Sequence, residues 1–333
     1  MIHWIDSADD PRLDPYRHVA DPAWIRDRHL FVAEGRLVVE RLITLGRFTV
    51  HSVLLNRAAH ASIGESLSTA GAPVLVCSNS SLLATITGYN FHRGCLALVT
   101  RPPLGTLADL LTCRCVLALE GVGNPDNIGG LFRTAAALGA QGVLLDERSG
   151  DPFYRKAIRT SMGAVLRLPF VRAENWNETL GTFREHGFKV IALTPSASAV
   201  DLSEVPPLGA DDRVLMMVGA EGPGLNTASL EEADLRVRIP IDGALDSLNV
   251  VVAAGIALES LRLQRNNRID SRCAPGGAQP GKAGDDEHEC RGGGDGDGIG
   301  GRDLEQQTTC EPSERQRGSN AGRNANQREH DRL

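Results

Sequence analysis

Short apolar runs and amphipathic segments alternate over residues 112–265 of the chain. Five runs read as buried strands, at residues 116–119, 142–145, 189–193, 214–218 and 235–239. Segments with helical spacing lie between most of them, at residues 129–138, 154–161 and 178–186, and an Ala- and Val-rich helix over residues 249–263 closes the region. Alternating strands and helices are typical of an α/β fold in which a mostly parallel sheet carries helices on both faces. We therefore predict such a domain over residues 112–265.

The region before it, residues 1–104, also contains both short strand-like apolar runs and segments with helical spacing, over a shorter length. Apolar positions recur at helical spacing over residues 37–43, and residues 50–55, 73–77 and 96–100 read as short buried strands. This pattern predicts a small α/β domain. Pro102, Pro103 and Gly105 follow its last strand, and they indicate a linker between the two domains.

The last region, residues 266–333, has a different composition. It contains no aromatic residue, and its large aliphatic residues are Ile269, Ile299, Leu304 and Leu333. Such a segment buries too little apolar surface to offset the entropy lost on ordering, so we predict a disordered tail. Its mixture of both charge signs favours a dispensable extension over an arm that grips RNA, because such arms are usually basic.

Composition narrows the functional classes only slightly. The formal net charge of −7 does not point to a nucleic-acid binder, although a local basic face is compatible with it. No apolar stretch approaches the ~18 residues of a membrane span. The acidic N-terminus lacks the apolar core of a secretory signal, so we expect a cytoplasmic protein. The seven cysteines include no CxxC pair, and we predict neither a disulfide framework nor a metal site.

Several common catalytic motifs are absent from the sequence. Gly121 and Gly123 follow a predicted strand, as in a dinucleotide-binding fingerprint, but Asp126 stands where the third glycine belongs. A Walker A loop, an HExxH zinc motif and a GxSxG nucleophile elbow are also missing. The usual routes to hydride transfer, ATP hydrolysis and serine hydrolysis are therefore unsupported.

Three polar loops follow predicted strands instead. Their notable residues are, in chain order, Asn127, Gly129 and Arg133; Gly219, Glu221, Gly222 and Gly224; and Ile239, Pro240, Ser247, Leu248 and Asn249. Ligands of open α/β sheets bind beyond the carboxyl ends of the strands, so the three loops could share one pocket. Each loop also has a purely structural interpretation. Asn127 and Ser247 stand where helix N-caps are expected, while Arg133 and Asn249 could be solvated helix residues.

At these residues the sequence resembles the SpoU, or TrmH-type, branch of the SPOUT RNA methyltransferases. The likeness rests on three motifs in the family's order, Asn-x-Gly-x-x-x-Arg, Gly-x-Glu-Gly-x-Gly and Ile-Pro followed by Ser-Leu-Asn-Val, and on residues 159–164 between the first two. The first region is similar to the ribosomal-protein-L30e-like substrate-binding domain often fused to this family, through residues 31–35 and 92–94. The resemblance covers residues 15–265, and the tail lies outside it.

The resemblance implies a C-terminal deep trefoil knot, a rare topology that shapes the pocket for S-adenosylmethionine. The residues it implies for cofactor binding are Gly219, Gly222, Gly224, Ile239 and Leu248. It also implies a homodimer whose catalytic residues are Arg133, Asn127, Glu221, Ser247 and Asn249. In the family's proposed mechanism the arginine accepts or relays the proton of a ribose 2′-hydroxyl. A more conservative role is to hold a phosphate and stabilise the developing alkoxide, because arginine is ordinarily always protonated.

The sequence thus predicts an enzyme that transfers the methyl group of S-adenosylmethionine to a ribose 2′-hydroxyl of structured RNA. We expect rRNA ahead of tRNA, because accessory surfaces such as the first domain read RNA shape and loops. We expect no membrane partner, no DNA and no metal. The main alternative is a non-catalytic RNA-binding protein that retained the fold. A base-methylating SPOUT enzyme should lack the arginine motif, and a nicotinamide dehydrogenase comes last.

Overall fold

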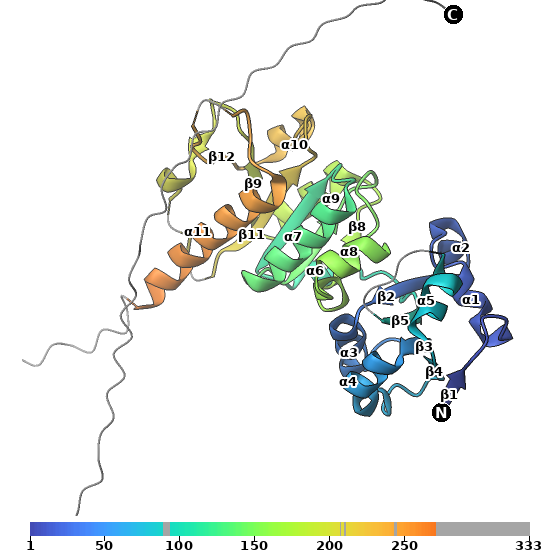
Figure 1. The fold of residues 1–333 in the computed structure, drawn as a ribbon. Coiled ribbons are helices and arrows are strands. Elements are labelled where there is room, and N and C mark those ends of the chain that lie inside the picture. Colours follow the sequence, from blue (N-terminus) through green and yellow to red (C-terminus); the bar gives the residue numbers. More distant parts are fainter. Residues whose placement is uncertain (89–93, 207, 210, 243–244, 271–333) are drawn as a thin grey trace, which may run out of the picture. The chain divides into compact units, whose positions relative to one another are not determined.

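Two β-sheets organise the residues that the computed structural model describes, which are residues 1–88, 94–206, 208–209, 211–242 and 245–270 (Figure 1). A five-stranded sheet comes first in the sequence and a seven-stranded sheet second. Both belong to the same compact unit. His92 and Arg93, which contribute to the likeness to the L30e-like domain, lie outside the described residues, as do residues 271–333 of the predicted tail.

The seven-stranded sheet is parallel throughout. Its strands stand in the order β10-β12-β9-β11-β6-β7-β8, and every adjacent pair is parallel. Their bounds are β6 Cys115–Glu120, β7 Gly142–Leu145, β8 Phe170–Arg172, β9 Phe188–Leu193, β10 Val200–Asp201, β11 Arg213–Gly219 and β12 Leu235–Arg238. The five predicted strands are confirmed, and with them the mostly parallel sheet. β8 and β10 have three and two residues, too few to show a period in the sequence.

Helices cover both faces of this sheet, as predicted. One face carries α7 (Pro125–Ala137), α8 (Arg155–Thr160) and α11 (Val250–Asp270), and the other carries α6 (Leu107–Leu111), α9 (Trp176–Glu185) and α10 (Thr227–Glu232). Alternation along β6 explains the two layers, because side chains of a strand point to opposite faces in turn. Leu117 and Leu119 belong to the core under α7, whereas Val116 and Ala118 belong to the core under α9. Residues 266–270 continue α11, beyond the predicted end of the domain.

The five-stranded sheet has mixed strand directions. Its order is β1-β4-β3-β5-β2; the β1–β4 and β3–β4 pairs are parallel, and the β3–β5 and β2–β5 pairs are antiparallel. Its strands are β1 Ile2–Ile5, β2 Leu30–Glu34, β3 Val50–Asn56, β4 Val74–Cys77 and β5 Cys95–Thr100. Its helices are α1 Asp14–Arg17, α2 Pro22–Asp27, α3 Arg36–Leu45, α4 Arg57–Leu67 and α5 Ser80–Thr87. The helix and the three strands predicted in this region are confirmed. That the region is a separate RNA-binding domain stays a prediction.

Contacts between β2 and the segment around α8 join the two sheets. Phe31 stacks on Phe153, with ring centroids 4.8 Å apart and an interplanar angle of 21°. Glu34, which is only 3 % exposed, accepts a hydrogen bond of 3.3 Å from Arg159 and forms a 3.7 Å ion pair with Arg155. Arg41 donates to the carbonyl of Met162, 2.5 Å away. A buried carboxylate is costly unless it is paired, so Glu34 and the two arginines form a specific link between the sheets.

The four cysteines in the described part of the chain, Cys77, Cys95, Cys113 and Cys115, are free and buried, in agreement with the absence of a disulfide framework there. Burial raises the pKa of the Cys77 thiol to about 11, so this thiol is neutral at physiological pH. Within the described residues, no helix is long and apolar enough to cross a membrane. In the same part of the chain, no group of three or more His, Cys, Asp or Glu residues has the arrangement of a metal site.

Candidate functional site

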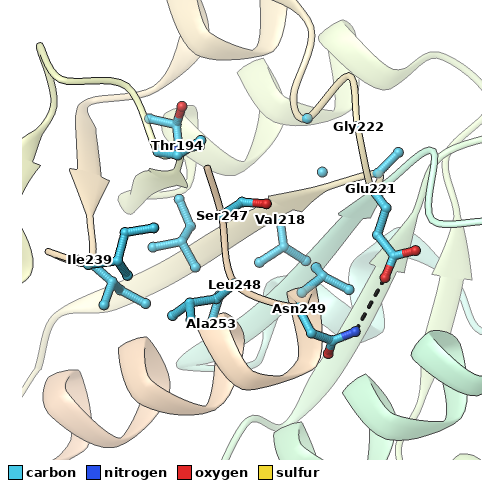
Figure 2. A pocket seen from close by; sticks show the side chains of 16 residues that line it. Thr194, Val218, Glu221, Gly222, Ile239, Ser247, Leu248, Asn249 and Ala253 are labelled. Carbon is cyan, nitrogen blue, oxygen red and sulfur yellow. Dashed lines mark hydrogen bonds between the residues drawn. The ribbon is translucent and has the colours of Figure 1, made fainter. Parts of the chain in front are cut away.

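A cavity of about 380 Å³ lies beyond the carboxyl ends of β9, β11 and β12 (Figure 2). It is lined by the segment after β9, the glycine-rich loop after β11, the segment after β12 and the first turn of α11. Parallel strands place all their carboxyl ends at one edge of a sheet, which brings together loops that are far apart in the sequence. The predicted convergence of the second and third polar loops is therefore present in the structure.

The glycine-rich loop turns back on the end of β11. Gly224 donates a backbone hydrogen bond of 3.0 Å to the carbonyl of Ala220. An added Cβ at Gly219 would lie 2.2 Å from the backbone carbon of Gly224, so no larger residue fits at the start of the loop. Gly222 and Gly224 have φ angles of 89° and 70°, which residues with side chains rarely adopt. These glycines allow a tight loop whose backbone forms one wall of the cavity.

The third loop forms the opposite wall. Ile239, Ser247 and Leu248 line the cavity before α11 begins (Figure 2). The purely structural interpretation of Ser247 as the cap of this helix is wrong. Asn249 takes the capping role instead, because its side-chain oxygen accepts a hydrogen bond of 2.9 Å from the backbone N–H of Val251. The hydroxyl of Ser247 is therefore not used by the helix terminus.

Three polar side chains from three elements meet beside the cavity. Asn127 of α7 and Asn249 each donate a side-chain hydrogen bond to the same oxygen of Glu221, over 2.6 and 3.2 Å. The amide of Asn249 also donates to the side-chain oxygen of Asn127, 3.2 Å away. Figure 2 shows the side chain of Glu221 directed toward Asn249. We call Asn127, Glu221 and Asn249 the polar triad.

The polar triad corrects the structural interpretation of Asn127. This residue does not cap α7, because the helix already begins at Pro125 and its cap is Asn124, whose side chain accepts a 2.9 Å hydrogen bond from the N–H of Asp126. Proline is favoured in the first helical turn, where it lacks only an N–H that would have no partner. Asn127 thus lies in the first turn, 7 % exposed, with its side-chain amide available to Glu221.

The other two residues of the first motif have different positions. An added Cβ at Gly129 would lie 2.5 Å from the carbonyl oxygen of Ala157, so this glycine allows α7 and α8 to pack closely. Arg133 is exposed on α7 and does not line the cavity. Its guanidinium makes no hydrogen bond or ion pair with the residues that the structure describes. Within one chain, the structure brings Asn127 to the site but not Arg133.

The cavity has a third wall that the motifs do not reveal. It consists of Leu193, Thr194 and Pro195, at and after the carboxyl end of β9 (Figure 2). The signal that could have identified them is positional, since they follow a predicted strand of the same parallel sheet. Thr194 adds a hydroxyl group to an otherwise largely apolar wall.

Two ion clusters hold the loops around the site. The buried carboxylate of Glu120, at the end of β6, accepts a 3.2 Å hydrogen bond from the N–H of Asn226, just after the glycine-rich loop, and pairs with Arg148 at 3.3 Å. A hydrogen bond from Lys156 lowers the pKa of the Asp126 carboxyl, next to Asn127, and Thr160 donates a second one. These contacts fix the ends of the first two loops to their neighbours.

Comparison with known proteins identifies relatives that match most of the chain. The sequence model of the SpoU rRNA Methylase family matches residues 114–259. A Mycobacterium bovis protein named as an uncharacterised tRNA/rRNA methyltransferase is 39 % identical over 254 residues, which are 75 % of this chain and 88 % of the relative. This match covers more residues than the family model does.

Solved structures give the same result at the level of the fold. An rRNA methyltransferase from Sinorhizobium meliloti, solved with bound AdoMet, has a TM-score of 0.67 and 27 % identity, and the alignment covers 79 % of this chain and 98 % of that one. A structure described as an RNA 2′-O ribose methyltransferase has a TM-score of 0.65 and 27 % identity, with coverage of 79 % and 100 %. Most of this chain thus has a fold similar to those of known RNA methyltransferases.

Proposed function

The chain belongs to the SpoU rRNA Methylase family, and on this premise we propose that it transfers the methyl group of S-adenosylmethionine to a ribose 2′-hydroxyl of structured RNA. The observation that carries the proposal is the polar triad, which comes from three separate elements and stands beside a cavity bounded by a glycine-rich loop. Among the similar structures is an RNA 2′-O ribose methyltransferase. We expect rRNA ahead of tRNA, in line with the S. meliloti relative.

The cavity has properties that fit S-adenosylmethionine. Its volume lies within the usual range for small-molecule sites, which is about 300–1,000 Å³. Ile239, Leu248 and Ala253 offer apolar contacts, while the backbone around Gly219 and Gly222 offers polar groups to an adenosyl moiety. When bound, this cofactor supplies an electrophilic methyl group. That a trefoil knot shapes the cavity is part of the proposal and rests on the family resemblance.

The polar triad has the geometry to orient a ribose. One oxygen of Glu221 accepts both amide hydrogen bonds, which leaves the second oxygen available to accept from a hydroxyl group. Asn127 and Asn249 hold the carboxylate in place, and Ser247 contributes a hydroxyl on the neighbouring wall. A fixed hydrogen-bond acceptor at this position would align the 2′-oxygen for reaction. Such an acceptor lowers the activation barrier more than a mobile one, because it does not have to reorganise during the reaction.

Arg133 would reach such a site from a second subunit. The residue is exposed and lies outside the cavity of its own chain. We infer that the enzyme is a homodimer in which Arg133 completes the site of the partner subunit. There the permanently charged guanidinium would hold an RNA phosphate and stabilise the developing alkoxide. Its alternative role, as the acceptor or relay of the ribose proton, uses the same position.

The test is incubation of the protein with labelled S-adenosylmethionine and bulk RNA from a host that lacks the gene. Digestion of the RNA to nucleosides should reveal labelled 2′-O-methyl nucleosides in the rRNA fraction. Their absence from both rRNA and tRNA would refute the proposal. The variant Asn249→Ala removes two hydrogen bonds of the polar triad, and we expect it to bind RNA but to methylate it much more slowly.

The exposure of Arg133 is also the one observation that favours a second function. A chain that stayed monomeric would lack the arginine at its cavity, and it would then be an RNA-binding protein without methyl transfer. Calorimetry combined with the methylation assay separates the two functions. Cofactor binding without turnover on any RNA, in a protein that sediments as a monomer, would favour the non-catalytic alternative.

A further inference from the structure

A second cavity, of about 300 Å³, lies between the two sheets and is distinct from the site described above. One wall comes from α2 and the residues before it, including Arg26. Gly123 and Pro125, in the segment that leads into α7, belong to the other wall, together with Tyr154 and Arg155 at the start of α8. We call this cavity the inter-sheet groove.

The inter-sheet groove carries a surplus of positive charge in a chain whose net charge is −7. Arg26 is exposed, and its guanidinium forms no ion pair with the residues described by the structure. Arg155 and Arg159 share the single carboxylate of Glu34, so these three residues together keep one positive charge. The fourth arginine of the region, Arg101, is neutralised by Asp151. Charge of this sign and density complements a phosphate group.

Continuity with the polar triad suggests which molecule provides the phosphate. Pro125 lines the groove and lies two residues before Asn127 in the same helix. At Gly123 an added Cβ would meet no atom within 4 Å, so the backbone there is open to a ligand. A strand of RNA with its ribose at the polar triad would therefore run past these residues into the groove. The half-buried ring of Tyr154 stands in the wall where a base would lie.

We propose that the inter-sheet groove binds an unpaired nucleotide of the RNA strand that carries the target ribose, a few positions from it. Arg26 and Arg155 contact its phosphate, and Tyr154 stacks on its base, as aromatic residues do in many single-strand binding sites. The inference rests on the proposed function. It adds that the substrate must be single-stranded next to the modified nucleotide.

The proposal is tested by fluorescence anisotropy with a short labelled single-stranded RNA, titrated over a series of salt concentrations. Loss of one phosphate contact in Arg26→Ala should weaken binding and reduce the slope of log affinity against log salt by roughly one. Tyr154→Ala should weaken binding by about tenfold and leave the slope unchanged, because base stacking is an uncharged contact. Arg12→Ala is the matched control, since Arg12 is an exposed arginine of the same region that pairs with Asp10 and lies outside the groove.

Four outcomes decide whether the groove binds RNA and whether the protein methylates it. Weaker binding in both groove variants, with a duplex RNA that competes poorly, supports the proposal. If Arg26→Ala and the charge reversal Arg26→Glu both bind RNA as tightly as Arg12→Ala, the groove is not an RNA site. If they bind RNA more weakly, misfolding is not the cause, because Arg26 is exposed. The methylation assay is scored separately. A protein that binds through the groove but forms no 2′-O-methyl nucleoside refutes the proposed function alone, whereas methylation unaffected by the groove variants refutes the groove alone.

Discussion

The two sheets of this chain both consist largely of buried strands, yet the cavity beside the polar triad lies at the edge of the seven-stranded sheet. In the seven-stranded sheet every adjacent pair is parallel, so the residues that follow β9, β11 and β12 line the same cavity. In the five-stranded sheet β5 is antiparallel to both of its neighbours, β2 and β3, so its carboxyl end lies at the edge opposite to those of the other four strands. Strand direction thus determines where residues distant in the sequence can combine into a site.

The five-stranded sheet contributes through its contacts. Its β2 ends in Glu34, which binds Arg155 and Arg159, and α8 in turn packs on α7 at Gly129. The polar triad is therefore supported from a distance by a sheet that supplies none of its residues. A site of this kind needs both an edge where loops converge and a second layer that holds the helices behind it.

The largest effect is expected for a substitution in the glycine-rich loop that follows β11. Gly219→Ala places a Cβ 2.2 Å from the backbone of Gly224, and the glycine-rich loop has to open. We expect the affinity for S-adenosylmethionine to fall by more than about a hundredfold, which corresponds to ~3 kcal/mol or more, as measured by calorimetry. Gly181→Ala in α9 is the control, because its Cβ would meet no atom within 4 Å. Equal cofactor affinity in the two variants would show that the loop does not bound the cofactor site.

The next largest effect concerns Arg133 on α7, the arginine of the first motif. Arg133→Ala should lower kcat by about 10²–10³-fold, the loss typical for a group that stabilises a developing charge, while cofactor affinity stays within about twofold because Arg133 does not line the cavity. Arg114→Ala is the control. Arg114 precedes β6 at the amino edge, where it pairs with Asp211 at 2.8 Å. A normal kcat in Arg133→Ala would remove this residue from the reaction.

Much of the parallel sheet was within reach of the sequence, because buried strands and amphipathic helices leave a period that a window of residues can show. Gly219, Ser247 and Leu248 of the second and third loops line one cavity, and their part in cofactor binding or catalysis stays a prediction. What the sequence does not contain is the exact partner of each side chain. Asn127 is of a residue type that favours the N-cap and stands where a cap is expected. The preceding Asn124 and Pro125 are the sign that the helix starts earlier. Neighbouring residues with similar capping propensities compete for the N-cap position, and the sequence pattern alone does not show which of them occupies it.

Other features depend on tertiary context that no local pattern encodes. Thr194 has no motif of its own, and it belongs to the site because β9 is next to β11 in the sheet. Arg133 belongs to a matched motif, yet it lies away from the polar triad within one chain. The link between Glu34 and Arg159 spans 125 residues of sequence. Such contacts follow from the packing of whole elements, which the sequence determines only through the complete fold.

The supporting sheet is tested by removing the charge of Glu34. Glu34→Gln leaves two guanidinium groups without their shared carboxylate, and we expect the free energy of unfolding to fall by about 2 kcal/mol, less than for a fully enclosed pair because Arg155 and Arg159 are partly exposed. Urea denaturation measures the change. Glu40→Gln is the control, because Glu40 of α3 accepts a hydrogen bond from the neutral Ser66. An equal loss in both variants would contradict a specific link between the sheets.

The smallest effect concerns Asp126, which joins α7 to α8 beside the polar triad. The hydrogen bond from Lys156 holds its pKa below the ordinary value, so the folded state binds fewer protons than the unfolded state. The resulting stabilisation is fully present above the unfolded pKa of about 4 and is lost as the pH falls through the lower folded value. Because the Asp126 side chain is 47 % exposed, we expect less than about 1 kcal/mol. In urea denaturation, Asp126→Asn should be slightly less stable than the wild type at pH 7, and this difference should shrink as the pH falls below the unfolded pKa. A difference independent of pH would show that the ion pair is not its cause.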